Sequence, residues 1–160
     1  MAEFSTTLTN EDIATSKTEG GTGRYAFKKM FGIKDNENEL PTVLGYTWGV
    51  KITKSKERPP LLVDAIEIEN YPCDLYALLF NRDTYYEYVG CATMKKLMQG
   101  GRSNFFHAIV YRVDNDKLLR MRPDWATMWW DAYNTFGPSG GWVIKDPTSG
   151  VVIAKALDVV

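Results

Sequence analysis

A basic, aromatic-rich stretch in the second half of the chain holds the residues best suited to binding chemistry. Cations and aromatic rings are interspersed along it, at Arg102, Phe105, His107, Tyr111, Arg112, Arg120 and Arg122. A strand would place Phe105, His107 and Tyr111 on one face, because side chains alternate between faces. Single-stranded nucleic acid binds such surfaces, since its bases stack on rings while cations hold its phosphates. A core strand with the same alternation is the interpretation that we favour, and RNA binding is the alternative.

A second group of candidate residues lies on one face of a predicted helix from Pro123 to Phe136. Proline suits the first position of a helix, and Gly137-Pro138 ends the run. Apolar residues recur at helical spacing, at Trp125, Met128, Trp129, Ala132, Tyr133 and Phe136. This stripe predicts that the helix anchors the core. If a cleft opens between the helix and a sheet, Trp125, Trp129 and Tyr133 would line an apolar ligand pocket.

The chain offers little for catalysis or metal binding. Its one histidine, His107, and its two cysteines, Cys73 and Cys91, are too few for a structural zinc site. The sequence has no nucleophile-elbow, zinc-protease, calcium-loop or phosphate-loop motif. We therefore predict no catalytic residue, no metal and no cofactor, and we favour a non-enzymatic protein. A scattered carboxylate or tyrosine site is the enzymatic alternative.

Two further clusters have both a chemical and a structural interpretation. Glu67 and Glu69 would share a strand face and could hold a hard cation there, but a solvated sheet face is preferred. The glycine-rich turn 20–24 precedes a short predicted helix over 25–31, and such a turn can present backbone N–H groups to an anion. No predicted strand precedes this turn and a Lys-Ser/Thr ending is missing, so we predict a hinge.

Charge is segregated along a chain that is nearly neutral overall. The formal net charge is −1, from 19 basic and 20 acidic residues. Residues 57–87 carry seven acids and two bases, a net charge of −5, whereas residues 94–122 carry two acids and seven bases, a net charge of +5. Such blocks could join complementary faces of neighbouring subunits, or they could pair within the fold.

The order of predicted elements defines the expected fold. The predicted helices span 84–99 and 123–136, and the predicted strands span 42–53, 61–69, 104–113, 117–121, 141–146 and 151–160. Residues 75–80 fit either a strand or a helix. Residues 1–24 are predicted to form an extended polar arm, which is either pinned on a neighbouring subunit or folded back. We expect an α+β fold with one globular domain over 25–160, built on an antiparallel sheet of about six strands in ββαββαββ order with two helices on one face.

The expected function follows from these features together. We predict a structural or assembly protein, such as a viral or phage shell or matrix component, that forms a homo-oligomer through its arm and its opposed charges. A single-stranded nucleic-acid-binding protein and a ligand binder or enzyme with an aromatic pocket are the alternatives. The first seven residues lack the parts of a signal peptide, and no apolar run is long enough to span a membrane. We therefore expect a cytoplasmic protein, or one within a virion.

Overall fold

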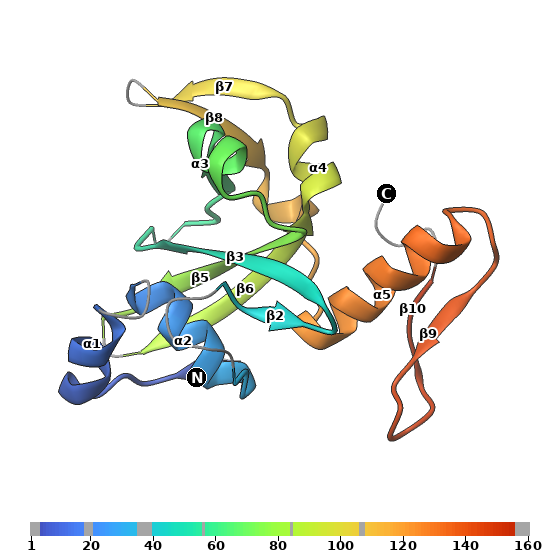
Figure 1. Cartoon of the computed structure of the whole chain (residues 1–160), viewed down its shortest axis with the longest axis horizontal. Coiled ribbons are helices and arrows are strands. Elements are labelled where there is room, and N and C mark those ends of the chain that lie inside the picture. The colour runs from blue at the N-terminus through green and yellow to red at the C-terminus, as the bar shows by residue number, and fades with distance from the viewer. Residues whose placement is uncertain are drawn as a thin grey trace.

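The fold is α+β, as predicted, and it is built around one mixed sheet (Figure 1). A computed structural model describes residues 4–17, 21–34, 40–55, 57–83, 85–105 and 108–155. The strands of the main sheet lie in the order β1 (Ser5–Thr6), β6 (Tyr86–Thr93), β5 (Leu75–Asn81), β3 (Tyr46–Thr53) and β2 (Thr42–Val43). β3 and β5 are parallel, whereas every other neighbouring pair in this sheet is antiparallel. The prediction of one antiparallel sheet of about six strands is therefore wrong, because the described strands form a mixed five-stranded sheet and two smaller sheets.

The central strand, β5, is apolar on both of its faces. Leu75, Ala77 and Leu79 point into one hydrophobic core, and Tyr76 and Leu78 point into the other. A strand covered on both faces has a continuous apolar sequence instead of an alternating one. This explains why residues 75–80 could not be assigned from periodicity alone.

Helices cover both faces of the main sheet, which corrects the prediction that they lie on one face. One face packs against α2 (Thr22–Phe31), whose Ala26 and Phe27 are fully buried, and α1 (Asn10–Ser16) lies against α2. The other face packs against α3 (Ala65–Asn70), α4 (Met94–Gln99) and a second sheet. That sheet has the strand order β4 (Leu61–Asp64), β8 (Ala108–Val113) and β7 (Arg102–Phe105).

The N-terminal segment folds back on its own domain. β1 pairs with β6, and the Phe4 ring lies 5.6 Å from the Phe31 ring, centroid to centroid. Lys29 Nζ donates to Asp12 Oδ2 over 2.8 Å and to the Thr7 carbonyl over 3.1 Å. The described part of the segment, residues 4–17 and 21–24, is therefore not an extended arm, and the folded-back alternative describes it.

Two predicted elements each split into a strand and a helix. The predicted helix over 84–99 is the strand β6 followed by the short helix α4, which begins at the N-cap Thr93. Thr84, on which the helix prediction depended, lies outside the described residues. The predicted strand over 61–69 is β4 followed by α3, so Glu67 and Glu69 lie on a helix and do not share a strand face.

Three other predictions differ from the structure in how strands pair. The predicted strand 104–113 is the hairpin of β7 and β8. The predicted strand 117–121 follows a 3₁₀ turn, Asn115–Lys117, and pairs only through Leu119, which exchanges two backbone hydrogen bonds with Cys91. The closing hairpin consists of β9 (Val143–Lys145) and β10 (Val152–Lys155), and residues 156–160 of the predicted last strand lie outside the described residues.

The predicted C-terminal helix is confirmed, but it does not lie along the main sheet. α5 (Pro123–Phe136) begins with proline and ends before Gly137. Figure 1 shows that its second half, together with the β9–β10 hairpin, extends away from the two sheets. Trp129 of this helix packs with Ile144 and Ala154 of the hairpin in a small third core.

A buried tryptophan links α5 to the main sheet. Trp48 of β3 is fully buried, and its ring centroid lies 5.6 Å from that of Phe27. Trp48 Nε1 donates to Thr127 Oγ1 over 3.1 Å, and Thr127 Oγ1 donates to the Pro123 carbonyl over 2.7 Å. Thr127 thus gives the buried indole N–H its acceptor and fixes the first turn of α5.

We expect the Thr127→Val substitution to lower the free energy of unfolding by about 1–3 kcal/mol, because it keeps the side-chain shape but leaves Trp48 Nε1 buried without an acceptor. Urea unfolding followed by tryptophan fluorescence measures the effect. Thr135→Val is the matched control, since exposed Thr135 makes the same bond to the carbonyl four residues earlier. It should change stability by less than about 0.5 kcal/mol. Equal effects of the two variants would contradict the role of Thr127.

The N-terminal segment should loosen in acid. The hydrogen bond from Lys29, followed by that from the Thr9 N–H, holds the pKa of the Asp12 carboxyl well below its ordinary value of 3.8. Because folding lowers this pKa, the contribution is complete above pH 3.8 and is lost as the pH falls toward the folded-state value. Hydrogen-exchange protection of residues 10–16 should therefore stay constant from pH 6 to about pH 4 and should fall between about pH 4 and pH 2.5.

An Asp12→Asn variant provides the control for this acid response. It removes the titrating group, so the segment should be less protected at pH 6 and should change little on acidification. The same pH dependence in both proteins would show that another group controls the segment.

Candidate functional site

The structure brings together only part of the predicted nucleic-acid surface. Arg102 Nε donates to the Tyr111 hydroxyl over 2.9 Å, and Arg112 Nε donates to Asp114 Oδ1 over 2.7 Å. Tyr111 is buried in the core between the two sheets, where its ring cannot stack on a base. His107 lies outside the described residues, and of Phe105 only the backbone is described, at the end of β7.

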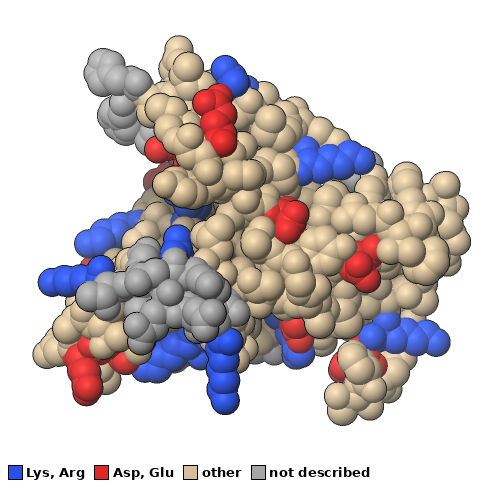
Figure 2. Space-filling view, in the orientation of Figure 1, with Lys and Arg blue, Asp and Glu red and all other residues tan. Residues whose placement is uncertain are grey.

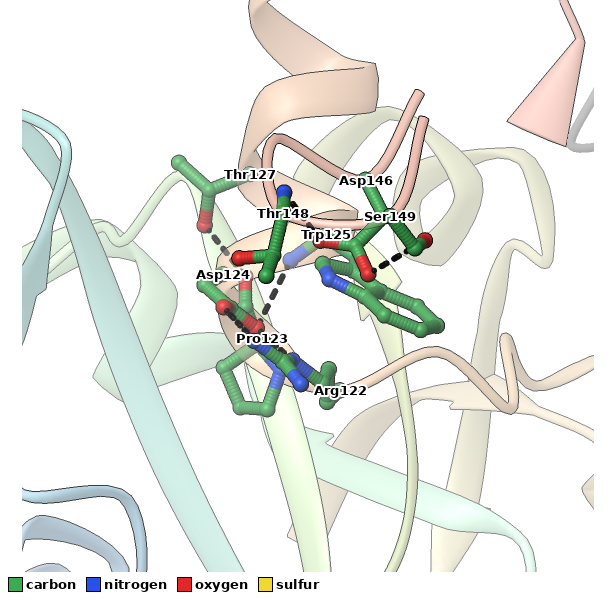
Figure 3. Close-up of polar contacts among 8 residues, drawn as sticks. All are labelled: Arg122, Pro123, Asp124, Trp125, Thr127, Asp146, Thr148 and Ser149. Atoms are coloured by element: carbon green, nitrogen blue, oxygen red, sulfur yellow. Dashed lines mark hydrogen bonds and ion pairs between the residues drawn. The ribbon is translucent and has the colours of Figure 1, made fainter. Parts of the chain in front are cut away.

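Arg120 and Arg122 make hydrogen bonds at other places in the fold. The Arg120 guanidinium donates to the carbonyls of Val89 and Asn115 over 2.8 and 2.7 Å. The Arg122 guanidinium lies at the start of α5, where it donates twice to the Asp124 carboxylate and lies 4.5 Å from the centroid of the Trp125 ring (Figure 3). Arg120 thus links β6 to the 3₁₀ turn, whereas Arg122 makes its contacts at the start of α5.

The three residues of the predicted aromatic pocket do not line a common cavity. Trp129 is buried, and its ring packs against Trp130 and Tyr133. The cavity beside these three rings has a volume of about 10 Å³, which is too small for an organic ligand. Trp125 lies instead beside the turn at Asp146 (Figure 3), and its indole N–H is buried with no acceptor in the described residues.

A cleft of about 530 Å³ lies at the edge of the main sheet, between α2 and α3. The start of α2 lines one side, and Glu67 and Tyr71 of α3 with Cys73 line the other. Four consecutive residues of β3, Gly49–Ile52, form the floor. Figure 2 shows a hollow between the part of the molecule that carries α3 and the part that carries α1 and α2, with charged side chains at its base.

Two glycines allow the walls of this cleft to approach one another. A Cβ atom on Gly23 would lie 2.7 Å from Ile52 Cγ2, so the start of α2 can rest on β3 only without a side chain there. A Cβ atom on Gly49 would lie 2.6 Å from the Tyr76 ring. The glycine-rich turn is thus a place of close packing. Gly49 lies within a predicted strand, and a glycine at such a position often marks the close approach of another group.

In the described part of the chain, the outer edge of β3 has no strand partner along the cleft. β2 pairs only with Tyr46 and Thr47, and the next outward bond runs from the Trp48 N–H to the Pro41 carbonyl over 2.8 Å. Beyond Trp48, no strand of the described residues pairs with this edge. The edge therefore presents backbone hydrogen-bonding groups to the cleft.

Three charged side chains line the cleft among the described residues. Lys51 of β3 and Glu67 of α3 form an ion pair across it, and Arg24 lies at the start of α2. The N-terminal end of α2 adds a partial positive charge beside them. Sequence reasoning named Glu67 and the glycine turn, but it missed Lys51 and Tyr71.

Cys73 forms part of the cleft wall but is not an activated nucleophile. Its Sγ lies 3.7 Å from the Tyr71 carbonyl, and its N–H donates to the Tyr76 hydroxyl over 3.2 Å. Burial raises the pKa of the Cys73 thiol to about 11. Cys91 lies on β6 and is fully buried, and burial raises the pKa of its thiol to about 12. Both thiols are free.

Metal and membrane sites were also sought in the part of the chain that the structure describes. There, no three carboxylate, cysteine or histidine side chains gather closely enough to hold a metal ion. No helix of the described residues combines the length and the apolar composition needed to cross a bilayer.

Comparison with known protein families, characterised proteins and solved structures finds no match for this chain. The functional argument therefore depends on the geometry alone.

The Cys73 thiol should react slowly in the native protein. Because its pKa is raised to about 11, the thiolate fraction should still rise about tenfold per pH unit between pH 8 and pH 10, where an exposed thiol levels off. A Cys91→Ser variant isolates Cys73, and the rate of its reaction with a coloured disulfide reagent measures the thiolate. A rate that levels off near pH 9 would contradict the raised pKa.

Proposed function

We propose that this chain is a non-enzymatic assembly protein that associates with further copies of itself through α5 and the β9–β10 hairpin. The observation that carries the proposal is the exposure of apolar side chains on this projecting unit. Phe136 is 65% exposed, and Val152 is 46% exposed on the outer face of the hairpin. A second copy that covers these side chains would remove their apolar surface from water.

The hairpin itself also favours association. A two-stranded hairpin is marginally stable alone, and this one rests on a core with only three buried residues, Trp129, Ile144 and Ala154. No third strand of the described residues pairs with β9 or β10. A neighbouring subunit that supplied further apolar contacts would enlarge this core.

The proposal moves the association surface from the N-terminal arm to the C-terminal unit. The described part of the arm packs on the main sheet of its own chain, so its apolar residue Phe4 already packs against the core there. One ion pair of the described residues also joins the two charge blocks within a single chain, between Arg102 and Glu69 at 3.7 Å. Association through apolar contacts should accordingly depend weakly on salt.

Light scattering coupled to size-exclusion chromatography tests the proposal across a range of protein concentrations and at two ionic strengths. The native chain should form a homo-oligomer at both ionic strengths. The double substitution Phe136→Ser and Val152→Thr should raise the dissociation constant at least about tenfold, since burial of one large apolar side chain contributes about 1.5–3 kcal/mol.

Ile66→Ser is the matched control, because Ile66 is 70% exposed but lies on α3. It should leave the oligomer unchanged. A native chain that is a monomer at every concentration, or an oligomer weakened equally by the control, would overturn the proposal.

A further inference from the structure

We propose that a cavity lined by Arg58, Arg82 and Arg120 binds the phosphate group of a small phosphomonoester. This arginine cavity has a volume of about 330 Å³, and its three arginines come from separate segments of the chain. A guanidinium group is a planar donor that matches the oxygen atoms of a phosphate. The site uses no residue of the proposed association surface and does not depend on it.

Arg120 is held in the wall of the cavity by neutral oxygen atoms. Its guanidinium donates to the Val89 carbonyl over 2.8 Å, and to the carbonyl and side-chain oxygens of Asn115 over 2.7 and 2.8 Å. A Cβ atom on Gly90 would lie 3.3 Å from Arg120 Nη1, so the absence of a side chain there lets the guanidinium approach β6. None of the ion pairs among the described residues includes Arg120, so its charge is not neutralised by a carboxylate of that part of the chain.

The same hydrogen bonds fix the backbone that carries Arg58. Asn115 Nδ2 donates to the Pro59 carbonyl over 2.9 Å, so the residue after Arg58 is tied to the residue that holds Arg120. Pro59 is buried and is followed by Pro60, and two consecutive prolines leave this segment little backbone freedom. The Arg58 side chain is exposed, and no ion pair of the described residues includes it. It can therefore turn toward a bound anion without losing an ion pair there.

The charges at the cavity favour an anion with more than one negative charge. Three arginines and two carboxylates, those of Glu57 and Glu87, give the side chains that line it a net charge of +1. Arg82 Nε lies 3.4 Å from Glu87 Oε2, so these two charges offset one another. Arg58 and Arg120 remain, and a phosphomonoester carries between one and two negative charges at neutral pH.

The aromatic rings at this cavity favour a ligand that is recognised by its phosphate and not by a base. The Arg82 guanidinium lies over the Phe80 ring, 3.9 Å from its centroid. Tyr88 is buried, its hydroxyl donates to the Met121 carbonyl over 2.6 Å, and its ring packs edge-on against Phe31. Neither ring offers a free face of the kind on which single-stranded nucleic acid stacks its bases. The volume is also near the lower limit for ligand sites, which suits a compact molecule.

The test titrates the full ¹⁵N-labelled chain with glycerol 3-phosphate and follows the amide resonances. Those of Arg58, Val89 and Asn115 should shift, and inorganic phosphate should compete for the same site. Glycerol alone should cause no change. A single-stranded RNA of six nucleotides with hydroxyl ends offers only phosphodiesters, so it should bind at least about fivefold more weakly. Affinity for glycerol 3-phosphate should also fall as the pH drops below about 6, because the phosphate then takes up a proton while the arginines stay charged.

Two substitutions of exposed residues should change the affinity in opposite directions. Arg58→Gln removes a charged donor and should weaken binding at least about fivefold. Glu57→Gln raises the net charge of the lining side chains and should strengthen binding about twofold or more. Arg112→Gln is the matched control, because Arg112 is an exposed arginine on β8 that does not line the cavity, and it should leave the affinity unchanged. Neither Arg58 nor Glu57 is buried, so both variants should fold.

Four outcomes would overturn the proposal. They are no resonance change at about 10 mM glycerol 3-phosphate, where even a weak site would be occupied, changes that leave Arg58, Val89 and Asn115 unaffected, equal loss of affinity in Arg58→Gln and Arg112→Gln, and binding of the RNA as tightly as glycerol 3-phosphate.

Discussion

The position of Trp48 constrains more of this structure than any other single side chain. Its ring lies on β3 beneath α2, in contact with Phe27, while its N–H is bound by Thr127 of α5. Three elements far apart in sequence are thereby held at one point. Because both Trp48 and Thr127 are fully buried, water cannot replace this hydrogen bond, and the start of α5 is fixed relative to the sheet.

The hydrogen bond between Trp48 and Thr127 also determines which part of α5 packs on the sheet and which part extends away from it. Its first turn belongs to the core on the α2 side of the sheet, through Ala126, whereas its last turn carries exposed Phe136. Between them, Tyr46 donates to Asp131 and Lys95 donates to Tyr133. The helix is thus held at its start and middle, and its far end carries the hairpin into solvent (Figure 1).

Local signals in the sequence predicted local structure well and long-range structure poorly. The proline start, glycine end and apolar stripe of α5 are all local, and its bounds were predicted correctly. For residues 84–99, the helical spacing of Tyr88, Cys91 and Met94 suggested one helix, but pairing with β5 makes the first half a strand. The cleft joins four separated segments around Gly49, so no motif could reveal it, although the glycine turn, which was predicted to be a hinge, lines one side of it.

The outer edge of β6 is paired by two segments that lie far apart in the chain, which has a consequence for biosynthesis. Near its start β6 pairs with Ser5 and Thr6, and at Cys91 it pairs with Leu119. A chain emerging from the ribosome therefore carries an unpaired N-terminal strand until β6 is made, and β6 keeps an exposed edge until Leu119 follows. The nascent chain passes through an interval in which strand edges are open to wrong partners, and a holding chaperone would act in that interval.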